Sequence, residues 1–266
     1  MNRIEIKKIN TQAKSDLLKK LKLERTFEPE IKSLFSQMHN DFRISVAATG
    51  QAPSAEDYSS AWEVLLRKHY KRTQDAFLGV VNLEKKDASY YIEHKLFEQL
   101  LALALLNYRK LRAVTQSMYI TRTNAKNMTD STSEARASLT EQELPVDNES
   151  LSKTATNILK RKTKGRVESI KTLETQNPAE NTKIMEARTQ AGDSPTDTKP
   201  SEVKKTWRTL GDSKVRASHK TANFQTVTLD ESFVVGESLL NFPGDNSLGA
   251  PVSQTINCRC AAVYRR

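Results

Sequence analysis

Glycine and proline, the residues that most readily end a helix, are few in this chain and lie mostly toward its C-terminus. The 266 residues include eight of each. Because both residues interrupt regular helices, the first two thirds of the chain is predicted to form long helices. Turns are predicted to concentrate in the last third, after a Pro-, Asp- and Thr-rich linker at residues 192–200. This distribution predicts an α+β protein in which helices come first and strands follow.

Apolar residues in the N-terminal part recur at steps of three and four residues, which is the period of an amphipathic helix. Pro29 is predicted to begin a helix that ends near Gly50, since the missing N–H of proline is unpaired in a first helical turn. Another helix is predicted to begin at the capping-box-like residues 54–57. The nearly apolar residues 87–119 predict a core helix that neighbouring helices must cover.

Residues 124–148 are polar and are predicted to join the helical part to the rest as a helix with frayed ends, with a further capping box at Ser131 and a break at Pro145. Helical periodicity resumes over residues 149–190. We therefore predict a helical N-terminal region at 1–148 and a C-terminal domain at 149–266 that begins with a basic helix.

The residues after the linker change to the Thr- and Val-rich alternation that is typical of strands. Strands are predicted at Lys205–Leu210, at Phe224–Leu229 and at Thr255–Tyr264. A short helix is predicted over Asp212–Lys220, and residues 241–254 are predicted to form a long loop. Strands that follow helices in this way predict a small α+β domain.

Basic residues exceed acidic residues, giving a formal net charge of +10. The excess is clustered, most densely in five cations within seven positions: Lys160, Arg161, Lys162, Lys164 and Arg166. Such a cluster predicts non-specific contact with the phosphates of a polyanion such as double-stranded DNA. The alternative is a solvated helix face that only aids solubility.

Membrane and secretion signals are not expected. The first ten residues lack a continuous apolar stretch, so no signal peptide is predicted. The longest apolar run, Leu100–Leu106, is far shorter than the roughly 20 residues of a membrane span. Two cysteines are too few for a disulfide framework, which favours a reducing compartment.

The last sixty residues contain an ordered series of residue types. The series comprises Trp207, Asp212, Val215-Arg216, His219, Glu231, Phe233, Pro243-Gly244-Asp245 and Asn257-Cys258-Arg259-Cys260. It resembles the C-terminal domain of the phage Mu protein F-like family of minor head proteins. Three positions depart from the family pattern. Ala222 and Asn223 stand where a glycine usually follows the histidine, Gln254 stands where a carboxylate is common, and Thr172 replaces an arginine.

The resemblance implies a minor capsid (head morphogenesis) protein of a tailed bacteriophage. Such a protein would lie inside the procapsid and virion, and in the host cytoplasm during assembly. Its implied partners are the portal protein, a scaffold or major capsid protein, and packaged DNA. No chemistry is required. The alternative is an enzyme for nucleotidyl or ADP-ribosyl transfer, or a nuclease, in which Glu174, Arg216 and His219 would converge in a cleft.

Both cysteines of the chain, Cys258 and Cys260, lie in the final motif. Residues two apart on a strand point to the same face, so the two thiols can project together. With His219 they would supply three good zinc ligands, and Asp212 or His94 could be a fourth. The alternatives are two buried thiols that act as small apolar groups, or a disulfide with a neighbouring chain.

Arg216 and Arg259 accompany the His and Cys elements of the motif. Each is predicted to bridge a carboxylate, such as Asp212 or Glu231, and so to hold together a domain with a small core. Contact with a phosphate is the alternative.

Overall fold

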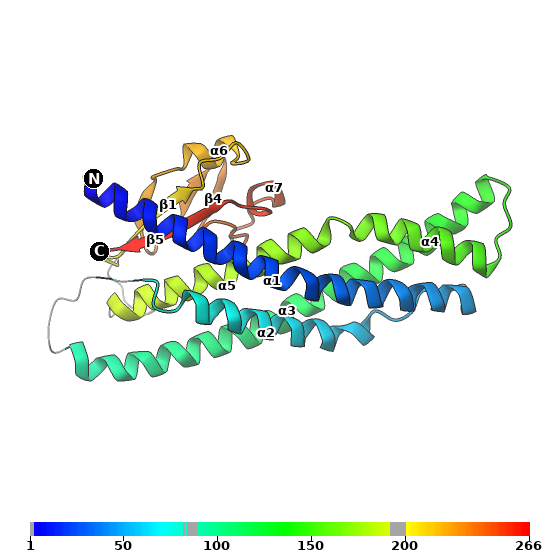
Figure 1. Ribbon diagram of the computed structural model, residues 1–266, viewed down its shortest axis with the longest axis horizontal. Helices are drawn as coiled ribbons and strands as arrows, with labels where there is room; N and C mark the ends of the chain where they lie inside the picture. The colour runs from blue at the N-terminus through cyan, green and yellow to red at the C-terminus, as the bar shows by residue number, and fades with distance from the viewer. Residues whose placement is uncertain (1–2, 82, 84–89, 192–200) are drawn as a thin grey trace. The chain divides into compact units, whose positions relative to one another are not determined.

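The computed structural model describes residues 3–81, 83, 90–191 and 201–266, with the backbone alone described over 90–97. The linker predicted at 192–200 lies outside the described residues. Long helices come first and short strands follow, so the predicted α+β class is confirmed (Figure 1). The long helices are α1 (Arg3–Thr49), α2 (Ser59–Phe77), α3 (Tyr90–Glu141), α4 (Asn148–Thr163) and α5 (Arg166–Ala191).

The chain forms two compact units, and neither is a single continuous stretch. The first unit comprises Met1–Arg25, Tyr70–Arg109 and Thr172–Arg266, and the second comprises Thr26–His69 and Lys110–Lys171. Segments of α1, α2, α3 and α5 contribute to both. The division at residue 148 stays a prediction.

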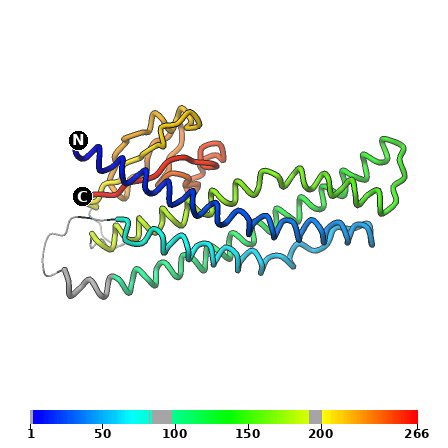
Figure 2. The backbone as a smooth tube through the Cα atoms, in the orientation of Figure 1, coloured from blue at the N-terminus to red at the C-terminus, as the bar shows by residue number. Residues whose placement is uncertain are grey.

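The second unit has a core made from one face of each helix segment. On α1, the buried side chains follow helical spacing: Phe27, Ile31, Phe35, Met38, Phe42 and Val46. Trp62 and His69 of α2 are buried too, with Trp62 packing edge-on against Phe35 and His69 stacked on Phe27 at 3.7 Å. The chain reverses between α3 and α4 over residues 142–147 (green in Figure 2).

Two helix boundaries predicted in this unit are wrong. Pro29 does not begin a helix, because α1 continues through it. Phe27 and Ile31 are both fully buried, and their packing on either side offsets the lost backbone hydrogen bond. The capping box at Ser131 does not begin a helix either, since α3 runs on to Glu141. There the Ser131 hydroxyl donates to the Asn127 carbonyl, four residues earlier.

The expectation that neighbours cover the apolar middle of α3 is only partly met. In the first unit, Leu101 and Leu105 are buried, while Leu100 and Leu103 are exposed. In the second unit, Leu111 is exposed as well.

The helical stretch predicted at 149–190 is two helices. Asp147 caps the start of α4 by accepting a hydrogen bond from the Ser150 N–H at 2.8 Å. The helix ends at Thr163, and α5 begins at Arg166, after Lys164 and Gly165.

The first unit contains a three-stranded antiparallel sheet in the order β2-β1-β5. The strands are β1 (Lys204–Thr209), β2 (Thr226–Thr228) and β5 (Cys260–Arg265). A separate hairpin pairs β3 (Phe233–Val235) with β4 (Ser238–Leu240) and was not predicted. Two short helices complete the unit, α6 (Ala217–Thr221) and α7 (Val252–Thr255). Trp207, Phe233, Leu240 and Tyr264 contribute to their shared core.

Strand β5 lies at the edge of its sheet, and buried charged side chains bond its outer backbone groups. Lys183 of α5 donates to the Ala262 carbonyl at 2.9 Å, and Lys20 of α1 donates to the Cys260 carbonyl at 3.2 Å. Lys183 also pairs with Asp16 and Glu180, each at 3.0 Å, and all three side chains are almost fully buried. The edge therefore presents no free row of hydrogen-bonding groups at these positions.

The Pro-Gly-Asp turn packs tightly against α5. Gly244 has φ +85°, and a Cβ atom there would lie 2.7 Å from Cγ of Gln176. The buried Asp245 carboxylate accepts hydrogen bonds from the backbone N–H groups of Asn241 and Ser247. Only glycine fits this turn without strain, because both the backbone angle and the space require it.

Candidate metal centre and basic segment

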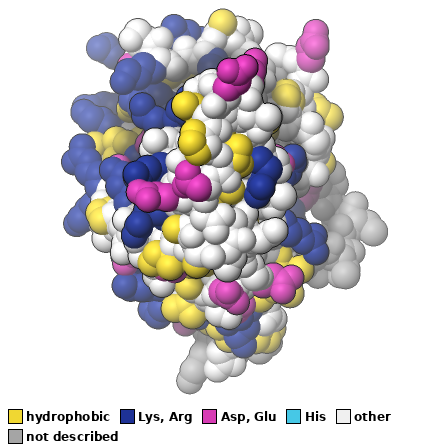
Figure 3. Space-filling view, turned by 90° about the vertical axis from the view of Figure 1, so that its right-hand side faces the viewer, with side chains coloured by type: hydrophobic (Ala, Val, Ile, Leu, Met, Phe, Trp, Pro, Cys, Tyr) yellow, Lys and Arg dark blue, Asp and Glu magenta, His cyan; other side chains and the backbone are white. Residues whose placement is uncertain are grey.

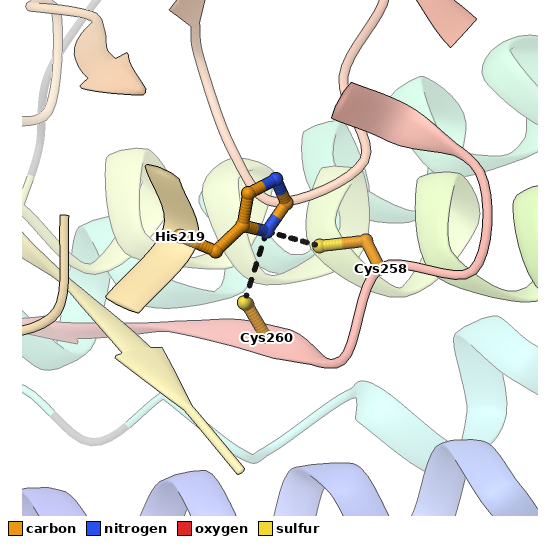
Figure 4. Close-up of side chains that lie close together, drawn as sticks. All are labelled: His219, Cys258 and Cys260. Atoms are coloured by element: carbon orange, nitrogen blue, oxygen red, sulfur yellow. Dashed lines mark hydrogen bonds between the residues drawn. The ribbon is translucent and has the colours of Figure 1, made fainter. Parts of the chain in front are cut away.

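Three buried side chains from separate parts of the first unit converge on one point: His219 from α6, Cys260 from the start of β5, and Cys258 just before it (Figure 4). Cys258 does not lie on the strand, so the predicted reason for its orientation is wrong. Asn257 instead has φ +53°, a left-handed conformation that asparagine adopts more readily than most residues. This turn allows both sulfurs to reach the same imidazole.

The Nδ1 atom of His219 lies 3.4 Å from Sγ of Cys260 and 3.6 Å from Sγ of Cys258. All three ligand atoms lie within 4.8 Å of one another. Both cysteines are free thiols. Because both are also buried, they are not placed for a disulfide with a neighbouring chain.

The two thiols have opposite tendencies to ionise. A hydrogen bond from the Cys260 thiol, together with the nearby His219, holds the pKa of Cys258 well below its usual range. Burial raises the pKa of the Cys260 thiol, and the neighbouring Cys258 raises it further. The pair therefore favours a single thiolate on Cys258, stabilised by the remaining thiol.

Gln254 holds the other side of the His219 ring. Its Oε1 atom lies 3.1 Å from Nε2 of His219 and also accepts a hydrogen bond from the Ser218 hydroxyl at 3.0 Å. An amide oxygen can only accept, so Nε2 carries a proton. If this is the only ring proton, the lone pair lies on Nδ1, the atom that faces the two sulfurs.

The cluster fits a zinc ion. With Zn–N of about 2.0–2.1 Å and Zn–S of about 2.3 Å, a tetrahedral site separates nitrogen from sulfur by roughly 3.5 Å, close to the two distances seen here. One sulfur already favours the thiolate, and an imidazole protonated only at Nε2 would offer the Nδ1 lone pair to the ion. The indole Nε1 of Trp207, buried without a hydrogen-bond partner among the described residues, lies beside Cys260 and suits a negatively charged sulfur.

Of the two candidate fourth ligands, Asp212 is engaged elsewhere. It pairs with Arg259, whose Nε donates to its Oδ2 atom at 2.9 Å, and this pair lowers the pKa of Asp212. The side chain of His94 lies outside the described residues. The described chain thus supplies three ligands, which leaves a fourth position for another group or a water molecule.

The other motif residues make structural contacts. The predicted bridge between Arg259 and a carboxylate is present as the pair with Asp212. Among the described residues, no carboxylate pairs with Arg216, which instead donates to the backbone carbonyl of Ile256 and so helps to hold the turn before Cys258. Asn257 Oδ1 accepts a hydrogen bond from the Thr172 hydroxyl of α5 at 3.3 Å.

The residues of the enzyme alternative are engaged in three different contacts. Glu174 is buried on α5 and accepts a 2.5 Å hydrogen bond from the Tyr70 hydroxyl. Arg216 bonds the Ile256 carbonyl, and His219 faces the two cysteines.

The five basic residues predicted to contact DNA belong to the second unit and are spread around the break between α4 and α5. Lys160, Arg161 and Lys164 are exposed. Lys162 forms an ion pair with Glu134 at 2.5 Å. Arg166 is partly enclosed, and burial lowers its pKa. Three of the five cations are thus presented to solvent, and Lys and Arg side chains are prominent at the surface in Figure 3.

Sequence reasoning missed two residues that support the cluster. Gln254 was considered only as a substitution in the motif, although it holds the ring of His219. Lys20, which the sequence pattern does not connect with any site, is buried and bonds the carbonyl of Cys260. No local pattern signals this contact, because it joins positions 240 residues apart.

Comparison of the chain with protein-family models, with curated proteins and with solved structures found no match. Within the described part of the chain, no helix is both long enough and apolar enough to cross a membrane.

Proposed function

We propose that the protein is a minor capsid protein of a tailed bacteriophage, associated with the portal vertex and packaged DNA, and that it acts through contacts. The observation that supports this proposal is that the motif residues contact one another and that several of them lie in the core of the small domain. Trp207 packs edge-on against His219 and Phe233, and Asp212 pairs with Arg259. The residues that carry the resemblance thus build and brace one small domain.

Loss of the gene tests this proposal. Particles lacking the protein are expected to assemble but to package or deliver DNA poorly. A His219→Gln variant should reproduce the defect only if it also destabilises the domain. A variant that folds and still associates with the portal, yet fails completely, would favour the enzyme alternative.

We also propose that His219, Cys258 and Cys260 hold a structural zinc ion. Zinc would link α6 to the turn before β5 and so add to the stability of the sheet. Protein purified without chelator should contain one zinc per chain by elemental analysis. Removing the ion should lower the thermal midpoint by several degrees, because metal binding is coupled to folding. Absence of stoichiometric metal would instead leave the buried-thiol interpretation.

DNA contact is assigned to the exposed cations Lys160, Arg161 and Lys164. Binding should be independent of sequence and should weaken as salt rises, since each neutralised phosphate releases counterions. Replacing all three by glutamine should reduce the slope of log affinity against log salt by about 3. The same change at Lys68, an exposed lysine that pairs with Glu30, provides the control. An unchanged slope in the triple variant would contradict the assignment.

A further inference from the structure

In the second unit, helix α3 presents a row of apolar side chains to solvent. Leu111 is 71% exposed, Met118 44% and Val114 38%. The three residues are spaced by three and four positions, so they lie along one side of the helix. The opposite side, with Ala113, Ile120 and Met128, is buried. Tyr119, beside the row, is 64% exposed.

The surroundings of this row are basic. Lys110 and Arg122 are exposed on α3 at either end of it. Arg166 of α5 is close enough to Tyr119 for the two to interact electrostatically. No Asp or Glu occurs anywhere between Gln99 and Thr129. An apolar row with cations at its margins, on a stretch of helix that contains no acidic residue, is complementary to an apolar row with acidic margins.

The width of the row indicates which kind of partner it fits. A stripe with one apolar residue every three or four positions is the narrow seam of a helix–helix contact. Helices that lie on a membrane surface instead present a broad apolar face. If a second copy of this chain packed on the row, Lys110 and Arg122 of one copy would lie close to Lys110 and Arg122 of the other. The repulsion between these cations is unfavourable.

We propose that this face of α3, residues 110–122, is a docking site for an amphipathic helix of a partner protein whose apolar seam is flanked by Asp or Glu. Leu111, Val114 and Met118 pack against the seam of the partner, and Lys110 and Arg122 pair with its acidic margins. The site spans only about three helical turns, so the contact is reversible.

The test uses the full-length protein and two labelled synthetic peptides of about three heptads. Both carry leucine at the seam; one carries glutamate at the flanking positions and the other lysine. Binding is measured by fluorescence anisotropy at peptide concentrations where each peptide is monomeric. The acidic peptide should bind at least about tenfold more tightly than the basic one, and its affinity should fall as salt rises.

A Leu111→Glu/Met118→Glu variant should lose at least about tenfold in affinity for the acidic peptide. Both positions are exposed, so the fold should be retained, as circular dichroism would verify. Val64→Glu, at an apolar position on α2 that is 67% exposed, is the matched control and should bind normally.

Four results would overturn the proposal: equal binding of both peptides, unchanged binding by the double variant, binding of phosphatidylglycerol vesicles through these residues without peptide binding, or a dimer in light scattering that the double variant dissociates. The last two would identify a membrane surface and a second copy, respectively.

Discussion

The Nε2 atom of His219 lies 3.1 Å from the Oε1 atom of Gln254, and this contact directs the other ring nitrogen toward Cys258 and Cys260. Partners of this kind fix the tautomer and the orientation of a metal-binding histidine. Gln254 comes from α7 and His219 from α6, so the contact also links two short helices of the first unit.

Replacing Gln254 by alanine should weaken zinc binding by about 10- to 100-fold, because His219 loses the acceptor that holds its ring. Gln254→Glu keeps an acceptor at the same place and should retain binding. Competition with a chromogenic chelator measures both affinities. Gln51→Ala, at an exposed glutamine of the second unit, is the control. Equal zinc affinity in Gln254→Ala and the unmodified protein would rule out this role.

The two thiols of the metal-free protein should ionise in separate steps. An ordinary thiol has a pKa of about 8.5, and the pKa of Cys258 is lowered while that of Cys260 is raised. The Cys258 thiolate therefore stabilises the fold at pH values above the pKa that this thiol has in the unfolded chain. That stabilisation is lost as pH falls through the lower pKa of Cys258 in the folded chain. The Cys260 thiol has the opposite effect, because its raised pKa makes the fold less stable as pH rises.

The ultraviolet absorbance of the thiolates should accordingly show one step below and one step above the ordinary thiol pKa. In a Cys258→Ser variant the lower step should disappear. Two thiols that titrate together near the ordinary pKa would contradict the arrangement in which the Cys260 thiol stabilises a thiolate on Cys258.

Lys183→Met should destabilise the first unit by about 3–5 kcal/mol, the usual cost of removing one partner from a buried ion pair. The change leaves Asp16 and Glu180 buried without their shared cation. Urea unfolding followed by circular dichroism measures the loss. Lys153→Met, which removes an exposed pair with Glu149, should cost less than about 1 kcal/mol. Similar effects of the two changes would show that the buried network contributes little.

Gly244→Ala should be clearly more destabilising than Gly249→Ala. Both glycines have positive φ, so both substitutions strain the backbone. Only at position 244 does the new methyl group also meet Gln176 of α5, whereas nothing lies within 4 Å at position 249. The difference between the two thermal midpoints isolates the effect of the clash. Adding Gln176→Ala to Gly244→Ala should recover part of the loss, and no recovery would locate the whole effect in backbone strain.

The amino-acid sequence by itself determined the class of fold, because helical periodicity and the position of turn-forming residues are local properties. It also identified His219, Cys258 and Cys260 as a group, from residue types that bind metals. It predicted β1 well, since the Thr and Trp residues of Lys205–Leu210 favour a strand. A short window of residues can specify the helices and the strand, whereas the group was recognised from residue types alone.

Tertiary structure decided the rest. Helix α1 passes through Pro29 because Phe27 and Ile31 are buried on either side of it, and local propensity cannot register that packing. Lys20 and Lys183, which look like surface cations in the sequence, bond carbonyl groups of β5 instead. Burying a charge is favourable only where partners from distant segments meet it, and the fold alone brings those segments together.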